Sequence, residues 1–337
     1  MKLTSTILTI IFSVLLFTNV QAGGIEWKSQ LQLKLPAEAK VLAYSADGSR
    51  IAVGHADGRV SVWSVKSGES VRILNAHSKE VNSVQFIKQD SQLLTIGDDN
   101  RAQLWSTSDW SEAGTIEGVA FAGGVSPDGL LLAAQDPKQA TWIWDLATSK
   151  PIKQLSEAGK GAGDNITFTA DGKYVAAAYN KALLINIETK QNFSFENNGD
   201  KKTSVKIEQQ GNQASISLGS MQDDDAPTHC LIPSRISSLV ALSRGWYGKP
   251  TFFDVWDINA SKRLLRFKPK DAGTLTSFSF DNSLLAIEGS EKVTILGIAS
   301  GKQDSSVKGS GIMQFSPKSM ELAVTDGSTL IIYVPKK

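Results

Sequence analysis

The sequence has little of the chemistry from which metal sites and disulfides are built. Its 337 residues include a single cysteine, Cys230, and three histidines. One cysteine excludes an internal disulfide and any zinc site made of several thiolates. Three histidines leave little material for acid–base catalysis. The sequence therefore predicts no bound metal and no cofactor.

An excess of charge of one sign is also missing. The 35 basic and 34 acidic residues give a formal net charge of +1. Proteins that bind nucleic acids or anionic membranes normally carry a strong basic excess. The balance therefore argues against a nucleic-acid partner. Hydrophobic residues make up 41% of the chain and charged residues 20%, which is the composition of a globular protein with a core.

Only one long hydrophobic run is present, and it stands at the N-terminus. Lys2 precedes an apolar stretch over 3–17, and Val20-Gln21-Ala22 places small residues where a signal peptidase reads. As a helix the stretch would extend about 22 Å, less than the roughly 30 Å of a bilayer core, which disfavours the alternative of an uncleaved anchor. We expect residues 1–22 to be a signal peptide.

The predicted cleavage after Ala22 would leave a soluble mature chain, 23–337, with no stable membrane insertion. No second apolar run in the sequence approaches the roughly 18 residues that a membrane-spanning helix needs. The expected location is therefore the periplasm of a bacterium, with an extracellular location as the second choice.

The sequence does contain a repeat of about 40 residues. Each copy holds a short apolar strand, a turn with Asp-Gly or a relative of it, a second strand, a polar turn and a third strand. In the first copy these strands are 41–44, 51–54 and 60–63, with Asp47-Gly48 in the turn. Glycine accepts the positive φ that tight hairpin turns demand. The pattern predicts stacked four-stranded antiparallel sheets without helices.

The third strand of most copies carries a tryptophan or an aliphatic residue at one fixed position. Most intervals between these positions are near 40 residues, and the fourth interval is much longer. The positions are Trp63, Trp105, Trp144, Ile185, Trp256, Leu296 and Ile332. Seven copies predict seven sheets, with additional chain between the fourth and the fifth.

Over residues 25–335 this repeat resembles that of the WD-repeat family of β-propellers. The strongest match is the second copy. The resemblance implies that its side chains form a hydrogen-bonded tetrad, in which His77 pairs with Asp99 and Thr95 bridges to Trp105. A buried indole N–H and a buried imidazole each need a partner, and such a chain of groups supplies both. We therefore expect His77 to have a structural role.

The resemblance also implies how the propeller closes. Residues 26–35 alternate between apolar and polar side chains, which indicates a strand with one buried face. The last copy ends at 329–334 without a fourth strand of its own, and propellers of the family are closed by an N-terminal strand. We predict one all-β domain with seven blades of four antiparallel strands, in which 26–35 pairs with 329–334.

The long interval has two interpretations. Residues 196–228 are an insertion after the fourth blade, with a hairpin around 209–212, or they are a decayed blade that would make eight. The segment has no third strand that ends in an aromatic residue, so we favour the insertion.

The remaining histidines and acidic residues give weak signals. We expect His55 at the surface, because it stands at the end of a second strand beside a turn. His229 and Cys230 would point to opposite faces of a strand and could share a metal ion only at a bulge. The acidic triplet at 223–225 lacks the spacing of a calcium loop, so we expect a solvated loop there.

One turn of the fifth copy departs from the short Asp-Gly form. Residues 244–250 read Arg-Gly-Trp-Tyr-Gly-Lys-Pro, so two aromatic residues stand between two cations. That composition is typical of binding hot spots. The candidate partner-binding residues are therefore Arg244, Trp246, Tyr247 and Lys249. The alternative is that Trp246 folds onto the insertion and only tethers it.

These observations favour a non-catalytic scaffold that binds another protein through one face of a monomeric propeller. The competing hypothesis is an exported propeller enzyme that resembles a lactonase or a quinone-dependent dehydrogenase. Such enzymes place acidic and polar metal ligands at the central channel. The first strands of this sequence carry no recognisable acidic set, so we expect no catalytic residue.

Overall fold

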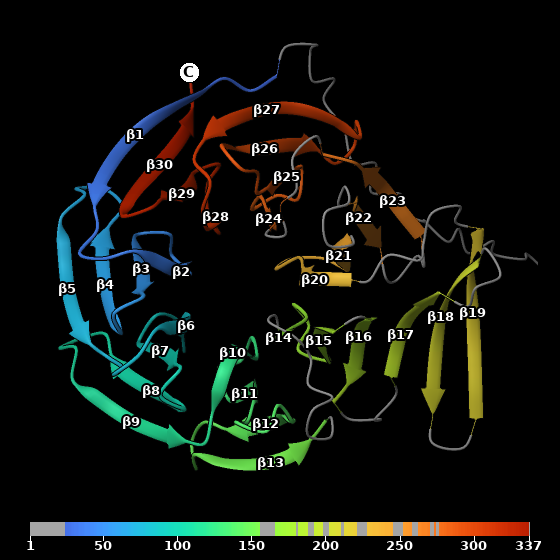
Figure 1. The fold of residues 1–337 in the computed structure, drawn as a ribbon, viewed down its shortest axis with the longest axis horizontal. Coiled ribbons are helices and arrows are strands. Elements are labelled where there is room, and N and C mark those ends of the chain that lie inside the picture. The colour runs from blue at the N-terminus through green and yellow to red at the C-terminus, as the bar shows by residue number, and fades with distance from the viewer. Residues whose placement is uncertain are drawn as a thin grey trace, which may run out of the picture.

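In the computed structural model the described part of the chain is built from thirty β strands, which form seven antiparallel sheets around a common centre (Figure 1). No helix in the described ranges is long and apolar enough to cross a membrane. The description covers residues 24–155, 166–179, 181–187, 192–197, 202–209, 212–220, 228–244, 252–257, 262–269, 273 and 276–336. The expected signal peptide, 1–22, lies outside these ranges.

The first three sheets each have four strands, paired in chain order from the centre outward. The first sheet consists of β2 (Ala39–Tyr44), β3 (Arg50–His55), β4 (Arg59–Ser64) and β5 (Ser70–Asn75). The second consists of β6 (Val81–Ile87), β7 (Gln92–Gly97), β8 (Arg101–Ser106) and β9 (Glu112–Glu117). The third consists of β10 (Ala120–Val125), β11 (Leu131–Gln135), β12 (Thr141–Asp145) and β13 (Lys150–Gln154).

The fourth sheet has six strands, because a hairpin extends its outer edge. Its strands are β14 (Ile166–Phe168), β15 (Tyr174–Tyr179), β16 (Lys181–Asn186), β17 (Asn192–Asn197), β18 (Lys202–Gln209) and β19 (Asn212–Ser220). The two outer strands come from the segment 196–228: β18 pairs antiparallel with β17, and β19 pairs antiparallel with β18. In the described residues, β18 and β19 therefore belong to the fourth sheet and form no sheet of their own (Figure 1).

The last three sheets return to four strands each. The fifth consists of β20 (Thr228–Pro233), β21 (Leu239–Arg244), β22 (Phe252–Asp257) and β23 (Lys262–Phe267). The sixth consists of β24 (Thr276–Phe278), β25 (Leu284–Ile287), β26 (Lys292–Gly297) and β27 (Lys302–Lys308). The seventh consists of β28 (Met313–Phe315), β29 (Leu322–Asp326), β30 (Thr329–Pro335) and, at its outer edge, β1 (Trp27–Lys34).

The predicted closure between the two ends of the chain is confirmed. β1 pairs antiparallel with β30, from Trp27 opposite Pro335 to Lys34 opposite Thr329 (Figure 1). The apolar face of β1 packs inward, with Leu31 and Leu33 against the cluster that contains Ile332. The all-β propeller expected from the repeat is thus the observed fold.

The hydrophobic core is divided among the interfaces between neighbouring sheets. One cluster joins Val62 of the first sheet to Leu93 and Trp105 of the second. Another joins Leu94 of the second sheet to Leu132 of the third. Because a sheet can bury both of its faces only between two neighbours, the repeat is stable only as a stack.

A recurrent turn connects the first strand of a sheet to the second. In the first sheet the Ser45 hydroxyl donates to Asp47 Oδ1 over 2.6 Å, and the backbone N–H of Arg50 donates to Ser45 Oγ over 2.9 Å. Gly48 has φ of 75°, a conformation that suits glycine. The same serine- or threonine-to-aspartate bond is made in the third, fourth and sixth sheets, by Ser126, Thr169 and Ser279.

Candidate functional site

The four side chains of the predicted tetrad form one chain of hydrogen bonds in the second sheet. Trp105 Nε1 donates to Thr95 Oγ1 over 3.2 Å, and the Thr95 hydroxyl lies 2.9 Å from His77 Nε2. His77 Nδ1 lies 2.9 Å from Asp99 Oδ1. Each polar atom finds a partner when the threonine donates to Nε2 and the imidazole donates from Nδ1. The tetrad therefore holds a neutral histidine.

Burial also favours the neutral state of this histidine. Removal from water lowers the pKa of His77 below its usual 6.5, against the opposing effect of the Asp99 carboxylate. The pKa of Asp99 is itself lowered. Its partial burial acts to raise that pKa, but hydrogen bonds from the Ser78 amide and the His77 ring outweigh the effect.

Glycine at position 97 makes room for the histidine ring. A Cβ atom at Gly97 would lie 2.5 Å from His77 Cγ, closer than two such atoms can approach. The tetrad thus depends on a residue without a side chain at the end of β7.

The first sheet contains a second buried histidine, and the expectation that His55 lies at the surface is wrong. Its exposed fraction is 0%. Trp63 Nε1 donates to Ser61 Oγ over 2.8 Å, and the Ser61 hydroxyl lies 2.7 Å from His55 Nε2. His55 Nδ1 faces the carbonyl oxygen of Ala37 at 3.2 Å. Ser61 therefore bridges the indole and the imidazole in the first sheet, as Thr95 does in the second.

The signal for this second network was present in the sequence. Ser61 stands two residues before Trp63, so the two side chains share one face of β4. Burial lowers the pKa of His55, although the nearby Asp57 carboxylate acts in the opposite direction. His55 and His77 are therefore buried polar groups with partners on both ring nitrogens, which fits a structural role.

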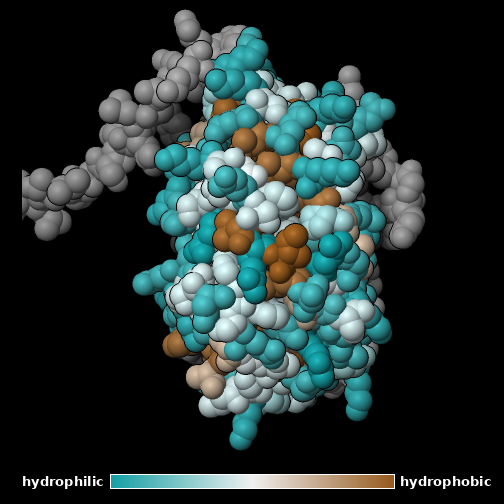
Figure 2. Space-filling model, turned by 90° about the vertical axis from the view of Figure 1, so that its left-hand side faces the viewer, coloured by the Kyte–Doolittle hydropathy of each residue, from teal (hydrophilic) through white to brown (hydrophobic). Residues whose placement is uncertain are grey.

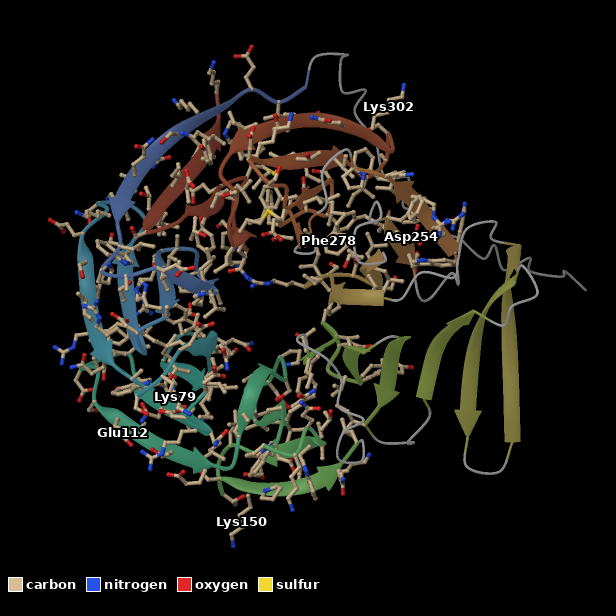
Figure 3. All side chains as sticks on the ribbon, viewed as in Figure 1. Lys79, Glu112, Lys150, Asp254, Phe278 and Lys302 are labelled. Carbon is tan, nitrogen blue, oxygen red and sulfur yellow. The ribbon has the colours of Figure 1, made fainter. Side chains whose placement is uncertain are left out.

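The fifth sheet has a buried ion pair that the sequence reasoning missed. Asp254 has an exposed fraction of 0% and accepts two hydrogen bonds from Arg266, at 2.7 Å from Nε and 2.8 Å from Nη2. Two parallel bonds of this kind are the strongest form of arginine–carboxylate pairing. Asp254 stands two residues before Trp256, as Ser61 does before Trp63. Figure 3 shows that Asp254 is set back from the centre of the ring.

The candidate partner-binding residues fall largely outside the described ranges. Arg244 ends β21, where its backbone is paired with Thr228. Trp246, Tyr247 and Lys249 belong to a segment that the structure does not describe. The topology still fixes which end of the fifth sheet this connection leaves from, because β21 ends beside the beginning of β20.

Strict alternation along β20 does not separate the His229 and Cys230 side chains. The register of β20 against β21 shifts between Thr228 and Cys230. First strands of other sheets show a comparable shift, for example between Ala39 and Val41. Within the described part of the chain, no group of three or more histidine, cysteine, aspartate or glutamate side chains is placed to hold a metal ion.

Exposed apolar side chains occur on the outer strands but are scattered. The larger ones there are Val71 and Ile73 on β5, Ile152 on β13 and Leu264 on β23. Figure 2 views the molecule from the side of β5 and shows small brown areas separated by hydrophilic surface. Scattered residues of this kind are normal on soluble proteins. The described residues on this side therefore form no contiguous apolar patch.

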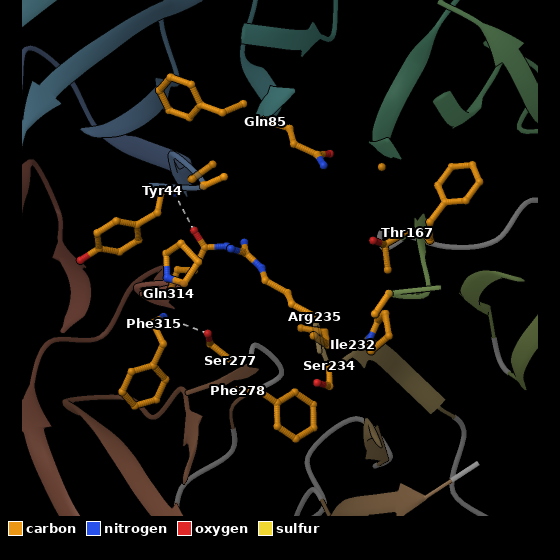
Figure 4. Close-up of a pocket in the computed structure, with 18 of the residues that line it drawn as sticks. Tyr44, Gln85, Thr167, Ile232, Ser234, Arg235, Ser277, Phe278, Gln314 and Phe315 are labelled. Carbon is orange, nitrogen blue, oxygen red and sulfur yellow. Dashed lines mark hydrogen bonds between the residues drawn. The ribbon is translucent and has the colours of Figure 1, made fainter. Parts of the chain in front are cut away.

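The centre of the ring holds a cavity with a volume of ≈ 590 Å³. Its lining comes from the innermost strand of every sheet and from the turns that follow those strands. Phe278 of β24 lies on this inner side (Figures 3 and 4). The cavity is large enough for a small organic ligand.

Comparison with known proteins supports the propeller fold. The WD40 domain of anaphase-promoting complex subunit 4 is the family that matches, over residues 24–89. The Cps50 (Swd1) β-propeller domain of Myceliophteria thermophila superposes with a TM-score of 0.72, covering 92% of this chain and 100% of that domain at 14% identity. The chain therefore has the β-propeller fold, and its residues 24–89 are similar to a WD40 domain.

The curated relatives of this propeller are similar over short stretches. Rat telomerase protein component 1 is 35% identical over 89 residues, which are 26% of this chain and 3% of that protein. Autophagy-related protein 16 of Arabidopsis thaliana is 26% identical over 128 residues, which are 36% of this chain and 25% of that protein. These relatives are eukaryotic, so they lend no support to the bacterial, exported form expected from the sequence.

The tetrad generates a prediction about stability. We expect Thr95→Val to lower the free energy of unfolding by about 3 kcal/mol, because it leaves Trp105 Nε1 and His77 Nε2 buried without a partner. Urea denaturation measures the change. The control is Thr115→Val on exposed β9, whose effect should stay within about 0.5 kcal/mol. Equal losses in the two variants would contradict a buried bridging role for Thr95.

The two neutral histidines predict how stability depends on pH. Their pKa values in the folded state lie below 6.5, so the unfolded chain binds more protons than the folded one below that pH. The free energy of unfolding should be constant above about pH 7 and should fall from about pH 6.5 toward pH 5. Urea titrations at pH 7.5 and 5.5 test this, and His77→Gln should show a weaker dependence. A flat profile in the unaltered protein would rule out the neutral state.

Proposed function

We propose that this chain is a non-catalytic scaffold that holds other proteins on a closed propeller of seven blades. WD40 propellers are generally non-catalytic and commonly bind other proteins. The seven sheets and the pairing of β1 with β30 support a closed ring. In such a ring the connections between strands are held in fixed positions, so that binding costs little loop entropy.

The contact surface that we propose is the face that carries the connection between β21 and β22. Its sequence places Trp246 and Tyr247 between Arg244 and Lys249, a composition enriched at the centres of protein interfaces. The hairpin of β18 and β19 belongs to the fourth sheet, which precedes this one in chain order. The additional segment 196–228 and the turn at 244–250 therefore come from consecutive sheets, the fourth and the fifth.

The competing enzyme hypothesis has less support. A lactonase-like or dehydrogenase-like site would need acidic ligands at the central channel. Among the described residues that line the cavity, none is aspartate, glutamate or histidine. The buried histidines and Asp254 are engaged by hydrogen bonds inside the sheets, away from that lining.

We also propose that the chain is exported, with the periplasm as its location. This proposal rests on the first 22 residues alone. We expect the mature protein to begin at Gly23, because a signal peptidase would cut after Ala22. Mass spectrometry of the N-terminal peptide recovered from cells tests this. Mature protein that retains Met1–Ala22 would contradict export by this route.

The scaffold function predicts a loss of affinity on one substitution. Partners are first captured by crosslinking in intact cells and identified by mass spectrometry. Trp246→Ala should then weaken binding of the purified partner by about 2 kcal/mol, roughly 30-fold, because a buried aromatic anchor is lost. The control is Leu130→Ala, which truncates a side chain with an exposed fraction of 55% at a turn on the other face. Equal affinity in the two variants would remove this surface from the proposal.

A further inference from the structure

The central cavity contains one charged side chain among its described lining residues, Arg235. The remainder of that lining is apolar or carries neutral polar groups. No described residue makes a hydrogen bond or ion pair with Arg235. Figure 4 shows its side chain extending from the fifth sheet across the cavity toward Gln314 and Tyr44 of the opposite wall. An arginine in this position has donors and a charge but no acceptor.

The recurrent turn explains why this arginine has no counter-ion. Arg235 follows Ser234 at the position that is Ala46, Pro127, Ala170 or Phe280 in the first, third, fourth and sixth sheets. The next position is an aspartate in each of those turns, and in the fifth sheet it is Ile236. This copy of the turn has therefore gained a cation at the cavity and lost its own carboxylate.

Hydrogen bonds to the sixth sheet hold this turn in place. Ser234 Oγ donates to Asn282 Oδ1 over 2.9 Å, and Asn282 Nδ2 donates to Ser237 Oγ over 2.8 Å. The Ile236 amide donates to Ser234 Oγ over 3.1 Å. The base of Arg235 is therefore fixed before any ligand arrives, which reduces the entropy lost on binding.

Two glutamine amides contribute further donors to the lining. Gln314 Oε1 accepts the Tyr44 amide over 2.9 Å, and Gln85 Oε1 accepts the Val125 amide over 3.0 Å. Since a backbone N–H requires an acceptor, these bonds fix which amide atom is oxygen. The Nε2 group of each glutamine makes no hydrogen bond with a described residue. Both face a cavity whose described lining has no carboxylate.

The chemistry of the cavity favours a ligand with one negative charge. Enclosure by protein lowers the pKa of Arg235 from its usual value, but a guanidinium stays charged at neutral pH. The Arg235 side chain is exposed to solvent and has no counter-ion among the described lining residues, so a bound anion can pair with it directly. One guanidinium matches a carboxylate in charge and in its two-oxygen geometry, whereas a phosphate dianion would keep a surplus charge.

The mouth of the cavity adds an apolar requirement. Ile236 and Phe280 border it and are 63% and 38% exposed. Pro127 and Pro317, from the corresponding turns of the third and seventh sheets, also line the cavity. Water-exposed apolar side chains beside a cation suit a ligand with a hydrocarbon part next to its acid group.

We propose that the central cavity binds a small organic carboxylate, with its acid group on Arg235 and its apolar part against Ile236 and Phe280. The site opens at the end of β20 that leads into the 234–238 turn, and the β21–β22 connection leaves from the other end. It is therefore separate from the proposed partner surface. Loss of one function would leave the other measurable.

The test uses hexanoate as the probe and hexanamide as its neutral counterpart, titrated calorimetrically into the mature protein at constant ionic strength. Hexanoate should bind saturably with one site, and hexanamide at least tenfold more weakly. Arg235→Gln should weaken hexanoate binding at least tenfold, and Arg235→Lys should restore only part of it, because lysine keeps the charge but loses the two-bond geometry. Arg72→Gln on the exposed strand β5 is the matched control and should change affinity less than twofold.

Several results would overturn the proposal. They are the absence of saturable hexanoate binding, equal binding by hexanamide, and equal binding by the Arg235→Gln and Arg72→Gln variants. If inorganic phosphate displaces hexanoate and binds more tightly at pH 7, the ligand of the cavity is a multivalent oxyanion and not a carboxylate. Thermal melts of each variant confirm that a lost signal does not come from lost folding.

Discussion

The pairing of β1 with β30 is the constraint on which the rest of this structure depends. Each sheet buries its faces only against its two neighbours, so an open stack would expose a hydrophobic face at both ends. β1 also reaches beyond its own sheet, because Trp27 Nε1 donates to Ser305 Oγ of the sixth sheet over 2.8 Å. Leu33 packs with residues of the first sheet, such as Ile51. One strand thus secures three consecutive sheets.

Closure also creates the cavity, because it brings the innermost strands of the sheets into a ring. Side chains of these strands then bond to the backbone of the neighbouring innermost strand. Gln314 of the last sheet accepts the backbone amide of Tyr44 in the first, across the junction where the chain begins and ends. Ser277 accepts the amide of Phe315 in the same manner, over 2.9 Å. Gln314 and Gln85 therefore join neighbouring sheets through Oε1 and keep Nε2 for the cavity, whereas Ser277 joins its neighbour through its only polar side-chain atom.

Much of the fold could be predicted from the sequence because the repeat is local. The period, the Asp-Gly turns and the strand 26–35 specify sheets and closure without knowledge of distant contacts. The buried state of His55 and the Asp254–Arg266 pair could not be inferred in the same way, because each depends on which face of a strand is covered. The role of Arg235 was missed because it appears only when the innermost strands of seven sheets meet around one centre.

A repeated architecture changes what a departure from the pattern means. The serine, aspartate and glycine of the turn satisfy the backbone in several sheets. The fifth sheet keeps the serine, Ser234, but loses the aspartate and the glycine, and Asn282 of the next sheet supplies hydrogen bonds in their place. The compensation preserves the fold but does not account for a cation aimed into the cavity. The same sheet also carries the unusual connection after Arg244 at its other end. The fifth copy thus departs from the repeat at both of its ends, and both of our binding proposals rest on these two departures.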